Sequence, residues 1–380
     1  MHLKVVGSLD ELPASQWDGL AGSDNPFACH AFLSALERTR CVGESSGWIP
    51  QHLAAFEQTN GSARVVGAVP MYLKLHSYGE FVFDWAWANA YARSGLTYYP
   101  KLVAAIPFTP VTGPRLLSEP GADGVGEALI SGAIDLARET GASSLHWLFT
   151  DEPTTHRLER HGLLRRVGNQ FQWRNDEYGD FDAFLASLSS RKRKQIRRER
   201  RQLREAGVRT EVLRGDDIDS ADWDRFYTFY RSTAHEHGAI PYLTREFFHE
   251  IGRALAARVV MVVARREERV IAAALNLFGG DALYGRYWGC AEHLSGLHFE
   301  TCYYRAIEYC IEHGLRRFEA GAQGEHKLSR GFLPTTTNSA HWIRHPQFAA
   351  AIEDFLARER QGVALYASEL ASHSPFRRDA

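Results

Sequence analysis

Apolar residues follow two periods along the chain, and these predict an alternation of short strands and helices. Runs or alternations of apolar residues predict strands over residues 3–6, 52–56, 65–73, 78–88 and 144–149. Spacings of three to four residues predict helices over residues 9–20, 31–40 and 125–140. The Asn60-Gly61 pair is a hairpin signal, and Gly141 marks a helix end. The pattern is that of an α/β protein.

One segment of the second half gathers an unusual number of polar side chains. A helix is predicted over 300–313, ended by Gly314, and a strand over 316–320 follows it. The loop around the end of this strand holds glycines and these polar residues: Glu319, Gln323, Glu325, His326, Lys327 and Arg330. Loops that directly follow strands are where α/β proteins usually keep binding and catalytic residues.

The second half repeats the plan of the first. Segments that match in order are 64–70 with 269–275, 78–88 with 284–290, and 134–149 with 307–322. A long unit used twice predicts two joined domains rather than a solenoid. A chain of 380 residues also exceeds what one hydrophobic core usually supports. We therefore predict domains over 1–175 and 208–380, joined by a basic helical linker over 176–207.

Composition narrows the class of protein only a little. The hydrophobic content of 44%, the charged content of 24% and the net charge of −2 are ordinary for a soluble protein. Five cysteines without a CxxC pair predict neither a zinc site nor a disulfide framework, so no metal is expected. The N-terminus turns polar at once, and no apolar run approaches the roughly 20 residues that span a bilayer. We expect no signal peptide, no integral membrane segment and a cytoplasmic location.

The most biased segment is 189–204, which carries nine basic residues and one acidic residue. Without proline or glycine it predicts a helix, and we name Arg193, Arg197, Arg200 and Arg201 as candidate anion-binding or RNA-binding residues. Like charges four residues apart destabilise a helix unless something neutralises them. Phosphates of a coenzyme, of RNA or of a lipid carrier would do so, and a solvated linker helix is the equal alternative.

Several long stretches match a known family. They are 69–74, 78–88, 98–102, 107–115, 189–194, 283–289 and 298–327. Together they cover nearly the whole chain, which resembles the FemAB-related (peptidoglycan biosynthesis/recognition) family of the tandem GNAT acyltransferases. The resemblance implies an α/β (α+β) fold of two tandem GNAT-like domains, each a mixed, largely antiparallel sheet flanked by helices.

The resemblance also implies an activity. Relatives of the FemAB type add amino acids from aminoacyl-tRNA to peptidoglycan precursors, and GNAT relatives move an acyl group from acyl-coenzyme A to an amine. An N-acyl or aminoacyl transferase is therefore expected, with acyl-coenzyme A or aminoacyl-tRNA as donor. The acceptor would be a small-molecule or peptide amine, such as a cell-wall precursor, and tRNA would then be a partner. The sequence gives no oligomeric state.

One departure from the GNAT pattern keeps an alternative open. The Arg/Gln-x-x-Gly-x-Gly/Ala turn that binds a pyrophosphate at a helix N-terminus is missing, and 321–324 is only a weak echo of it. The alternative is a non-catalytic module that binds a peptidoglycan precursor or RNA.

Amide formation needs a neutral amine, a donor to the carbonyl oxygen and a proton for the leaving group. Our catalytic candidates are Glu325, His326, His298 and Asp84. Lys327 matches in position the lysine that follows the last core strand in FemAB-type proteins, which implies a contact with anionic substrate groups. Further substrate-binding candidates are Arg330, Arg286, Tyr284, Trp85 and Gln323.

Each candidate also has a structural alternative. A salt-bridged surface loop would explain 325–327, and a helix cap or an ion pair would explain Asp84. We interpret Cys290 and Cys302 as buried small residues, since no base is indicated beside them.

Overall fold

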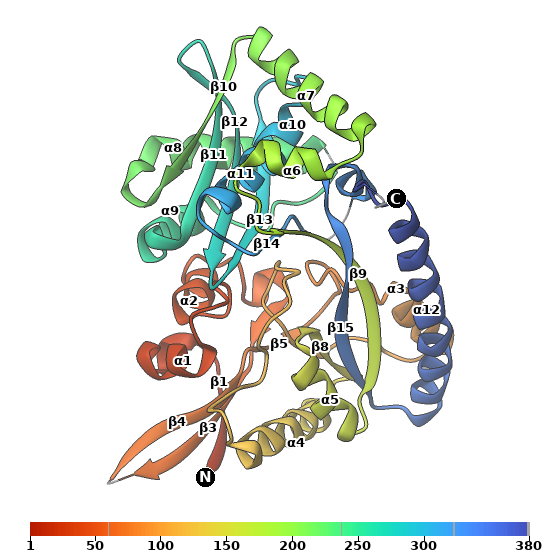
Figure 1. Cartoon of the computed structure of the whole chain (residues 1–380). Helices are drawn as coiled ribbons and strands as arrows, with labels where there is room; N and C mark the ends of the chain where they lie inside the picture. Colours follow the sequence, from red (N-terminus) through yellow and green to blue (C-terminus); the bar gives the residue numbers. More distant parts are fainter. Residues whose placement is uncertain (60, 237, 322–323, 378–380) are drawn as a thin grey trace. The chain divides into compact units, whose positions relative to one another are not determined.

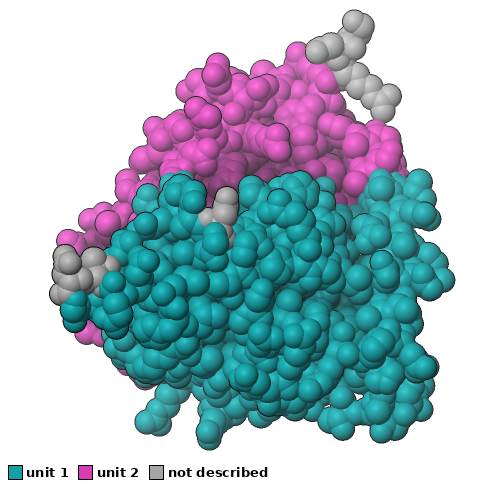
Figure 2. Space-filling model, turned by 90° about the horizontal axis from the view of Figure 1, so that it is seen from below, with its two compact units in different colours: residues 1–168, 336–365 teal, residues 169–335, 366–380 magenta. Residues whose placement is uncertain are grey.

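A computed structural model describes residues 1–59, 61–236, 238–321 and 324–377 (Figure 1). The chain forms two compact units, which Figure 2 colours separately: unit 1 contains residues 1–168 and 336–365, and unit 2 contains residues 169–335 and 366–380. This composition differs from the predicted division of the chain. Residues 176–207 belong to unit 2 instead of forming a separate linker, and the segment 336–365 returns to unit 1.

Unit 1 contains two sheets. The first has the order β1 (His2–Val6), β3 (His52–Thr59), β4 (Ser62–Val69) and β7 (Leu117–Ser118), all antiparallel. The second has the order β2 (Trp48–Pro50), β5 (Met71–Lys74), β6 (Lys101–Ala104), β8 (Ser144–Thr150) and β15 (Leu333–Ile343). Only the β6–β8 pair is parallel. The helices are α1 (Ala14–Ala21), α2 (His30–Arg38), α3 (Trp85–Arg93), α4 (Asp123–Glu139) and α5 (Glu152–Arg160).

Most predicted elements of unit 1 are confirmed, but the strand predicted over 78–88 is wrong. Residues 78–84 form turns and irregular backbone, and helix α3 begins at Trp85. Trp87 and Tyr91, four residues apart, are both buried, whereas Trp85 is 37% exposed. A strand would have placed Trp85 and Trp87 on one face. The alanines that alternate with the aromatic residues, Ala86, Ala88, Ala90 and Ala92, favour the helix.

Unit 2 is built on one sheet with the order β10 (Val208–Arg214), β11 (Val259–Arg266), β12 (Arg269–Gly279), β13 (Ala282–Cys290), β14 (Arg317–Glu319) and β9 (Leu164–Arg174). The β13–β14 pair is parallel and its other pairs are antiparallel. Its helices are α6 (Phe181–Ser187), α7 (Ser190–Glu205), α8 (Ser220–Glu236), α9 (Arg245–Ala254), α10 (Leu297–Phe299) and α11 (Arg305–Glu312). The long α12 (Pro346–Ser372) begins in unit 1 and ends in unit 2.

Helices cover both faces of the unit 2 sheet (Figure 1). Helices α8 and α9 lie on one face, where Tyr287 of β13 contacts Tyr230 and Phe248. Helix α11 lies on the other, where Phe318 of β14 is fully buried in the main core cluster. The predicted helix 300–313 is present, but it starts at α10 and is π-helical from Glu300 to Tyr304. A π-helical turn inside an α-helix is often found at a functional site.

The predicted repeat matches the structure in some segments and not in others. Each unit contains a helix that ends at a glycine with positive φ, Gly141 at 71° and Gly314 at 65°. In each unit a strand follows this glycine and runs parallel to its neighbour. The segments 78–88 and 284–290 do not correspond, since the first is a turn and a helix and the second is strand β13. The internal duplication stays a prediction.

No helix in the described part of the chain combines the length and the apolar character that crossing a membrane requires.

Candidate functional site

The parallel strands β13 and β14 separate within the unit 2 sheet. Their last residue pair is Tyr284 with Glu319, and beyond it β13 continues to Cys290 paired with β12 only. A β-bulge lies at the same point, where the register of β12 against β13 shifts between Tyr287 and Gly285. Bulges of this kind bend a strand and redirect its side chains, and they are frequent beside active sites. The sheet therefore has an opening beyond the Tyr284–Glu319 pair.

A pocket of about 100 Å³ lies at this opening. Strands β12 and β13 supply most of its wall, and the start of the helix supplies the rest. The lining residues are Ala274, Leu275, Asn276, Gly285, Arg286, Tyr287, Trp288, His298, Cys302, Tyr303 and Ala320. Two predicted residues, Arg286 and His298, are thus brought together in one pocket.

His298 is held among aromatic rings at the start of the helix. Its ring lies 4.9 Å from that of Trp288 and 5.2 Å from that of Tyr303, edge to face in both cases. Burial, followed by the charges of His326 and Arg330, lowers the pKa of His298 to about 4. The imidazole is therefore neutral at pH 7, and it can accept a hydrogen bond from a substrate.

His326 belongs to a 3₁₀ segment, Glu325–Arg330, that follows β14. Its Nε2 forms a hydrogen bond of 2.9 Å with the hydroxyl of Tyr303, which lines the pocket. Burial, then the charges of Lys327 and Arg330, lowers the pKa of His326. The contact couples the exposed His326 to the pocket through one hydroxyl group.

Lys327 and Arg330 of the same segment are buried, at 3% and 4% exposure. The ammonium of Lys327 donates to the carbonyl of Gly321 at 2.8 Å. Burial lowers the pKa of Lys327 to about 8, and Cys302 and Arg286 of the pocket are close enough to influence it. Arg330 stacks on the ring of Phe299 at 3.3 Å and donates to the carbonyl of His326 at 2.8 Å.

The structure also places the other residues of unit 2 that the sequence singled out. Glu325 is exposed and accepts a hydrogen bond from the hydroxyl of Tyr366 on α12. Tyr284 is buried and accepts from Arg317 at 3.3 Å. Burial raises the pKa of the Cys302 thiol, which makes it a poor nucleophile. Gln323 lies outside the described residues.

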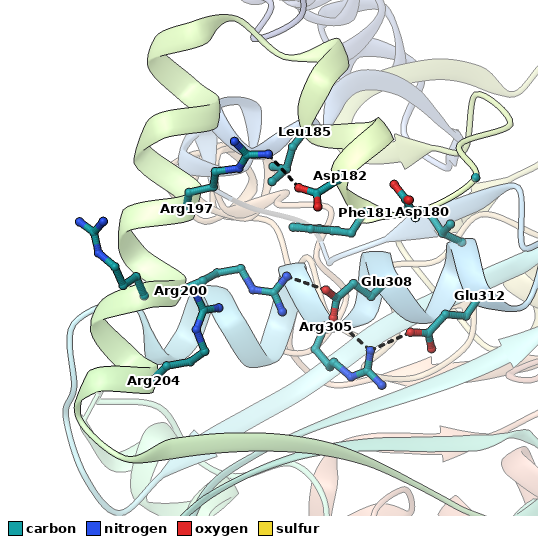
Figure 3. Close-up of a pocket in the computed structure, with 13 residues that line it drawn as sticks. Asp180, Phe181, Asp182, Leu185, Arg197, Arg200, Arg204, Arg305, Glu308 and Glu312 are labelled. Carbon is teal, nitrogen blue, oxygen red and sulfur yellow. Dashed lines mark hydrogen bonds and ion pairs between the residues drawn. The ribbon is translucent and has the colours of Figure 1, made fainter.

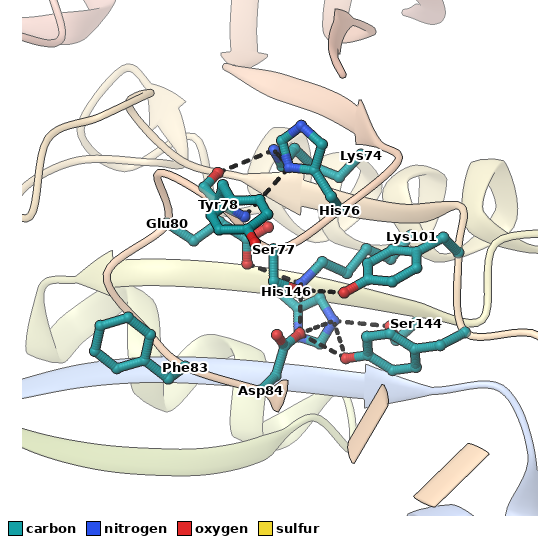
Figure 4. A network of polar contacts seen from close by, with 12 residues as sticks. Lys74, His76, Ser77, Tyr78, Glu80, Phe83, Asp84, Lys101, Ser144 and His146 are labelled. Atoms are coloured by element: carbon teal, nitrogen blue, oxygen red, sulfur yellow. Dashed lines mark hydrogen bonds and ion pairs between the residues drawn. The ribbon is translucent and has the colours of Figure 1, made fainter. Parts of the chain in front are cut away.

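Asp84 and Trp85 lie in unit 1, where Asp84 belongs to a buried polar network (Figure 4). The ammonium of Lys101 contacts both Asp84 and Glu80, the latter at 2.8 Å, and donates to Ser77 at 2.9 Å. Burial would raise the pKa of Asp84, but the charge of Lys101 outweighs it and holds the pKa low. Of the two structural alternatives for Asp84, the structure thus shows the ion pair. Trp85 packs its ring against Tyr78.

The network extends from Asp84 through hydroxyl and imidazole groups. Tyr98 donates to Asp84 at 2.6 Å and lies 3.3 Å from Nε2 of His146. The Nδ1 atoms of His146 and His341 are 2.6 Å apart, so one ring donates to the other. Burial, followed by the charge of Lys101, lowers the pKa of His146 to about 3, and both rings are neutral. These groups fix the buried geometry of unit 1.

The predicted anion-binding arginines lie on α7. Three of them, Arg197, Arg200 and Arg201, line a hollow of about 650 Å³ within unit 2 (Figure 3). Arg200 forms ion pairs with Glu300 at 2.9 Å and with Glu308, and its side chain is only 17% exposed. Arg197 pairs with Asp182 at 2.9 Å, and Arg201 lies 3.7 Å from Glu205. Arg193 lies 3.5 Å from the carbonyl of Ala186. Acidic residues of the same unit therefore neutralise Arg200.

Sequence reasoning left two charged residues out of the candidate set. Lys101 is the buried centre of the unit 1 network, and Glu319 ends β14 with 4% exposure and no hydrogen-bond partner for Oε2 among the described residues. The sequence did offer one indication of Glu319: it is an acidic residue at the end of a predicted strand, two positions before Gly321. The described residues bring no group of three His, Cys, Asp or Glu side chains together in a way that would hold a metal ion.

Comparisons with known proteins agree with this fold. The FemAB-like family model, described as peptidoglycan biosynthesis/recognition, matches residues 8–378. The solved structure of FemX has 11% identity and a TM-score of 0.56, and the match covers 93% of this chain and all of FemX. The C-terminal domain of a protein assigned as a lysylphosphatidylglycerol synthetase from Agrobacterium fabrum has 10% identity and a TM-score of 0.54. The match covers 91% of this chain and 96% of that domain's chain.

A conserved protein of unknown function from Bacteroides thetaiotaomicron has 10% identity and a TM-score of 0.51, covering 90% of this chain and 100% of its own. No curated protein matches the chain. The predicted family and the mixed α/β fold class are confirmed.

Proposed function

The chain belongs to the FemAB-like family, and we propose that unit 2 transfers an acyl or aminoacyl group to an amine at the opening between β13 and β14. The observation that carries the proposal is this separation of two parallel strands beside a bulge and a pocket. A donor carbonyl placed there lies between the β13 backbone and the helix that starts at Leu297. Such placement holds both reactants in one orientation, which accounts for much of the rate enhancement in transfer reactions.

Four side chains have the chemistry that the reaction needs. The Lys327 ammonium supplies positive charge for the carbonyl oxygen as it becomes negative, in a site from which water is largely excluded. The neutral imidazole of His298 accepts a hydrogen bond from the donor substrate held in the pocket. The Tyr303–His326 hydrogen bond offers a path for a proton to the leaving group.

The pocket limits the size of the transferred group. Its volume of about 100 Å³ is small, which favours a short acyl group. We propose acyl-coenzyme A or aminoacyl-tRNA as the donor, a cell-wall precursor or related amine as the acceptor, and the cytoplasm as the location.

A thermal-shift panel tests which donor binds. Coenzyme A, short acyl-coenzyme A, aminoacyl-tRNA and a lipid-linked precursor are each added to the purified chain. A ligand present at 100 times its Kd stabilises the folded state by about 2.7 kcal/mol, which raises Tm. We expect one donor class to raise Tm, and its acyl form more than its deacylated form. A panel without any shift would contradict the proposal.

Helix α7 favours a second candidate function, RNA binding without catalysis. Arg191, Lys194 and Arg198 are exposed and have no acidic partner within 4 Å in the described part of the chain. Together with Arg201 they recur every three to four residues and line one outer side of the helix. The stripe carries no exposed apolar residue, which favours a phosphate backbone over a membrane surface.

The variant Lys194→Ala/Arg198→Ala/Arg201→Ala tests the stripe. Each lost phosphate contact lowers the slope of log affinity against log salt concentration by about 0.7–0.9, so we expect the slope for RNA to fall by roughly 2. The matched control is Arg253→Ala on α9, an exposed arginine. An unchanged slope in the triple variant would remove the RNA candidate.

A further inference from the structure

Glu319 is a buried carboxylate with an unused oxygen at the opening itself. It is the last residue of β14 and pairs with Tyr284, the last residue of β13 to have a partner on that side. Its exposure is 4%, and Oε2 has no hydrogen-bond partner among the residues that the structure describes. A buried acceptor without a donor costs free energy and is rare in native structures. It therefore needs an explanation.

Two glycines border the opening beside Glu319. Gly285 follows Tyr284 and lines the pocket, and Ala320, which also lines it, follows Glu319. A side chain at Gly321 would come within 4.0 Å of the Gly285 carbonyl, so two glycines face each other directly beyond the last strand pair. No side chain of these two residues closes the gap.

The side chain of Glu319 points to the face of the sheet opposite to that of His298. Phe318 packs into the core cluster beneath α11, and neighbouring residues of a strand point to opposite faces. Glu319 therefore points to the face covered by α8 and α9. A donor held on the side of His298 and an acceptor held on the side of Glu319 would meet in the opening.

The groups around Glu319 do not fully neutralise it. Arg317 on its own strand is 3.8 Å away, and Arg286 on β13 acts on it more weakly. Tyr284, also on β13, is the other titratable neighbour. Burial outweighs both arginines and raises the pKa of Glu319 to about 7. A base whose pKa lies near the working pH is the most effective one.

We propose that Glu319 binds the acceptor amine and acts as its general base, an assignment that rests on the proposed acyl transfer. Glu319 takes one proton from the acceptor ammonium. The freed nitrogen forms a bond to the donor carbonyl carbon, and the bond from this carbon to the leaving sulfur or oxygen breaks. The second proton of the nitrogen passes to the leaving atom, and Glu319 releases its proton to water.

The test compares pH profiles of Glu319→Gln, Glu319→Asp and the exposed control Glu246→Gln. In the wild type and the control, kcat rises with pH as Glu319 ionises around pH 7, before the decline above about pH 8 that loss of the Lys327 charge causes. In Glu319→Gln we expect kcat to fall by about 10²–10⁴-fold and this rise to disappear. Glu319→Asp keeps the rise at a lower kcat, and it serves as the folded comparison if the glutamine variant is unstable.

The outcomes separate the two proposals. If the wild type transfers the group, and Glu319→Gln keeps kcat within threefold of the wild type with an unchanged pH profile, only the role of Glu319 is overturned. No transfer by the wild type with either donor class overturns the proposed function as well.

Melting curves provide a readout that does not depend on activity. Since the pKa of Glu319 is raised on folding, ionisation of this group destabilises the fold as pH rises from about 4.5 to about 7. Glu319→Gln should therefore melt higher than the wild type at pH 8, whereas Glu246→Gln should not.

Discussion

Replacing Lys101 by methionine is expected to lower the free energy of unfolding of unit 1 by about 3–5 kcal/mol. The Lys101 side chain is fully buried, and its ammonium forms ion pairs with both Asp84 and Glu80 (Figure 4). Without it two carboxylates remain in a water-free interior. One oxygen of each, Glu80 Oε1 and Asp84 Oδ1, already lacks a hydrogen-bond partner among the described residues. The charge of Lys74 also reaches Glu80, but its ammonium donates to the carbonyl of Tyr78 instead.

Urea unfolding followed by fluorescence measures this effect, with Lys4→Met as the matched control in the same unit. Lys4 forms an ion pair with Glu11 at 3.2 Å, but both side chains are about half exposed, and such pairs contribute about 0–1 kcal/mol. A loss for Lys101→Met no larger than that of the control would show that the network does not hold unit 1 together.

Replacing Lys327 by methionine is expected to reduce kcat by about 10²–10³-fold while the fold stays intact, which is the usual effect of removing one stabilising donor. The ammonium is 3% exposed and lies near two pocket residues, Cys302 and Arg286. Because its pKa is near 8, the charge is lost as pH rises through this value. The wild-type kcat should therefore decline above about pH 8, and this decline should be absent in the variant.

Steady-state rates from pH 5.5 to 9.5 measure both effects. Arg269→Ala, an exposed basic residue at the start of β12, serves as the control and should keep the wild-type profile. The variant's far-UV spectrum and Tm establish that it is folded. Equal kcat values for Lys327→Met and the wild type would exclude Lys327 from the chemistry.

The sequence predicted most helices and strands, because their signals are local. Gly141 and Gly314 end their helices as expected, each with a positive φ that glycine adopts without strain. The failure at 78–88 has a physical reason. Aromatic residues at every second position fit a strand. The alanines between them, and the burial of Trp87 and Tyr91 four residues apart, favour the helix that begins at Trp85.

The polar sites were harder to predict, because they depend on contacts between distant residues. His146 and His341 are 195 positions apart in the chain and share one hydrogen bond. Arg200 looked like an anion contact in a run of basic residues, and its acidic partners lie about 100 positions later. Glu319 was visible as an acid after a strand, but only the end of the β13–β14 pairing shows why it is special.

Direct detection of the amide product tests the central claim, that unit 2 performs acyl transfer. The full chain is incubated with a ¹³C-labelled short acyl-coenzyme A or aminoacyl-tRNA and with a panel of amine acceptors, and the mixture is analysed by mass spectrometry. We predict an acceptor whose mass increases by that of the labelled acyl group, with turnover that depends on Lys327. A wild-type chain that binds donor and acceptor but leaves every acceptor at its original mass would contradict the account.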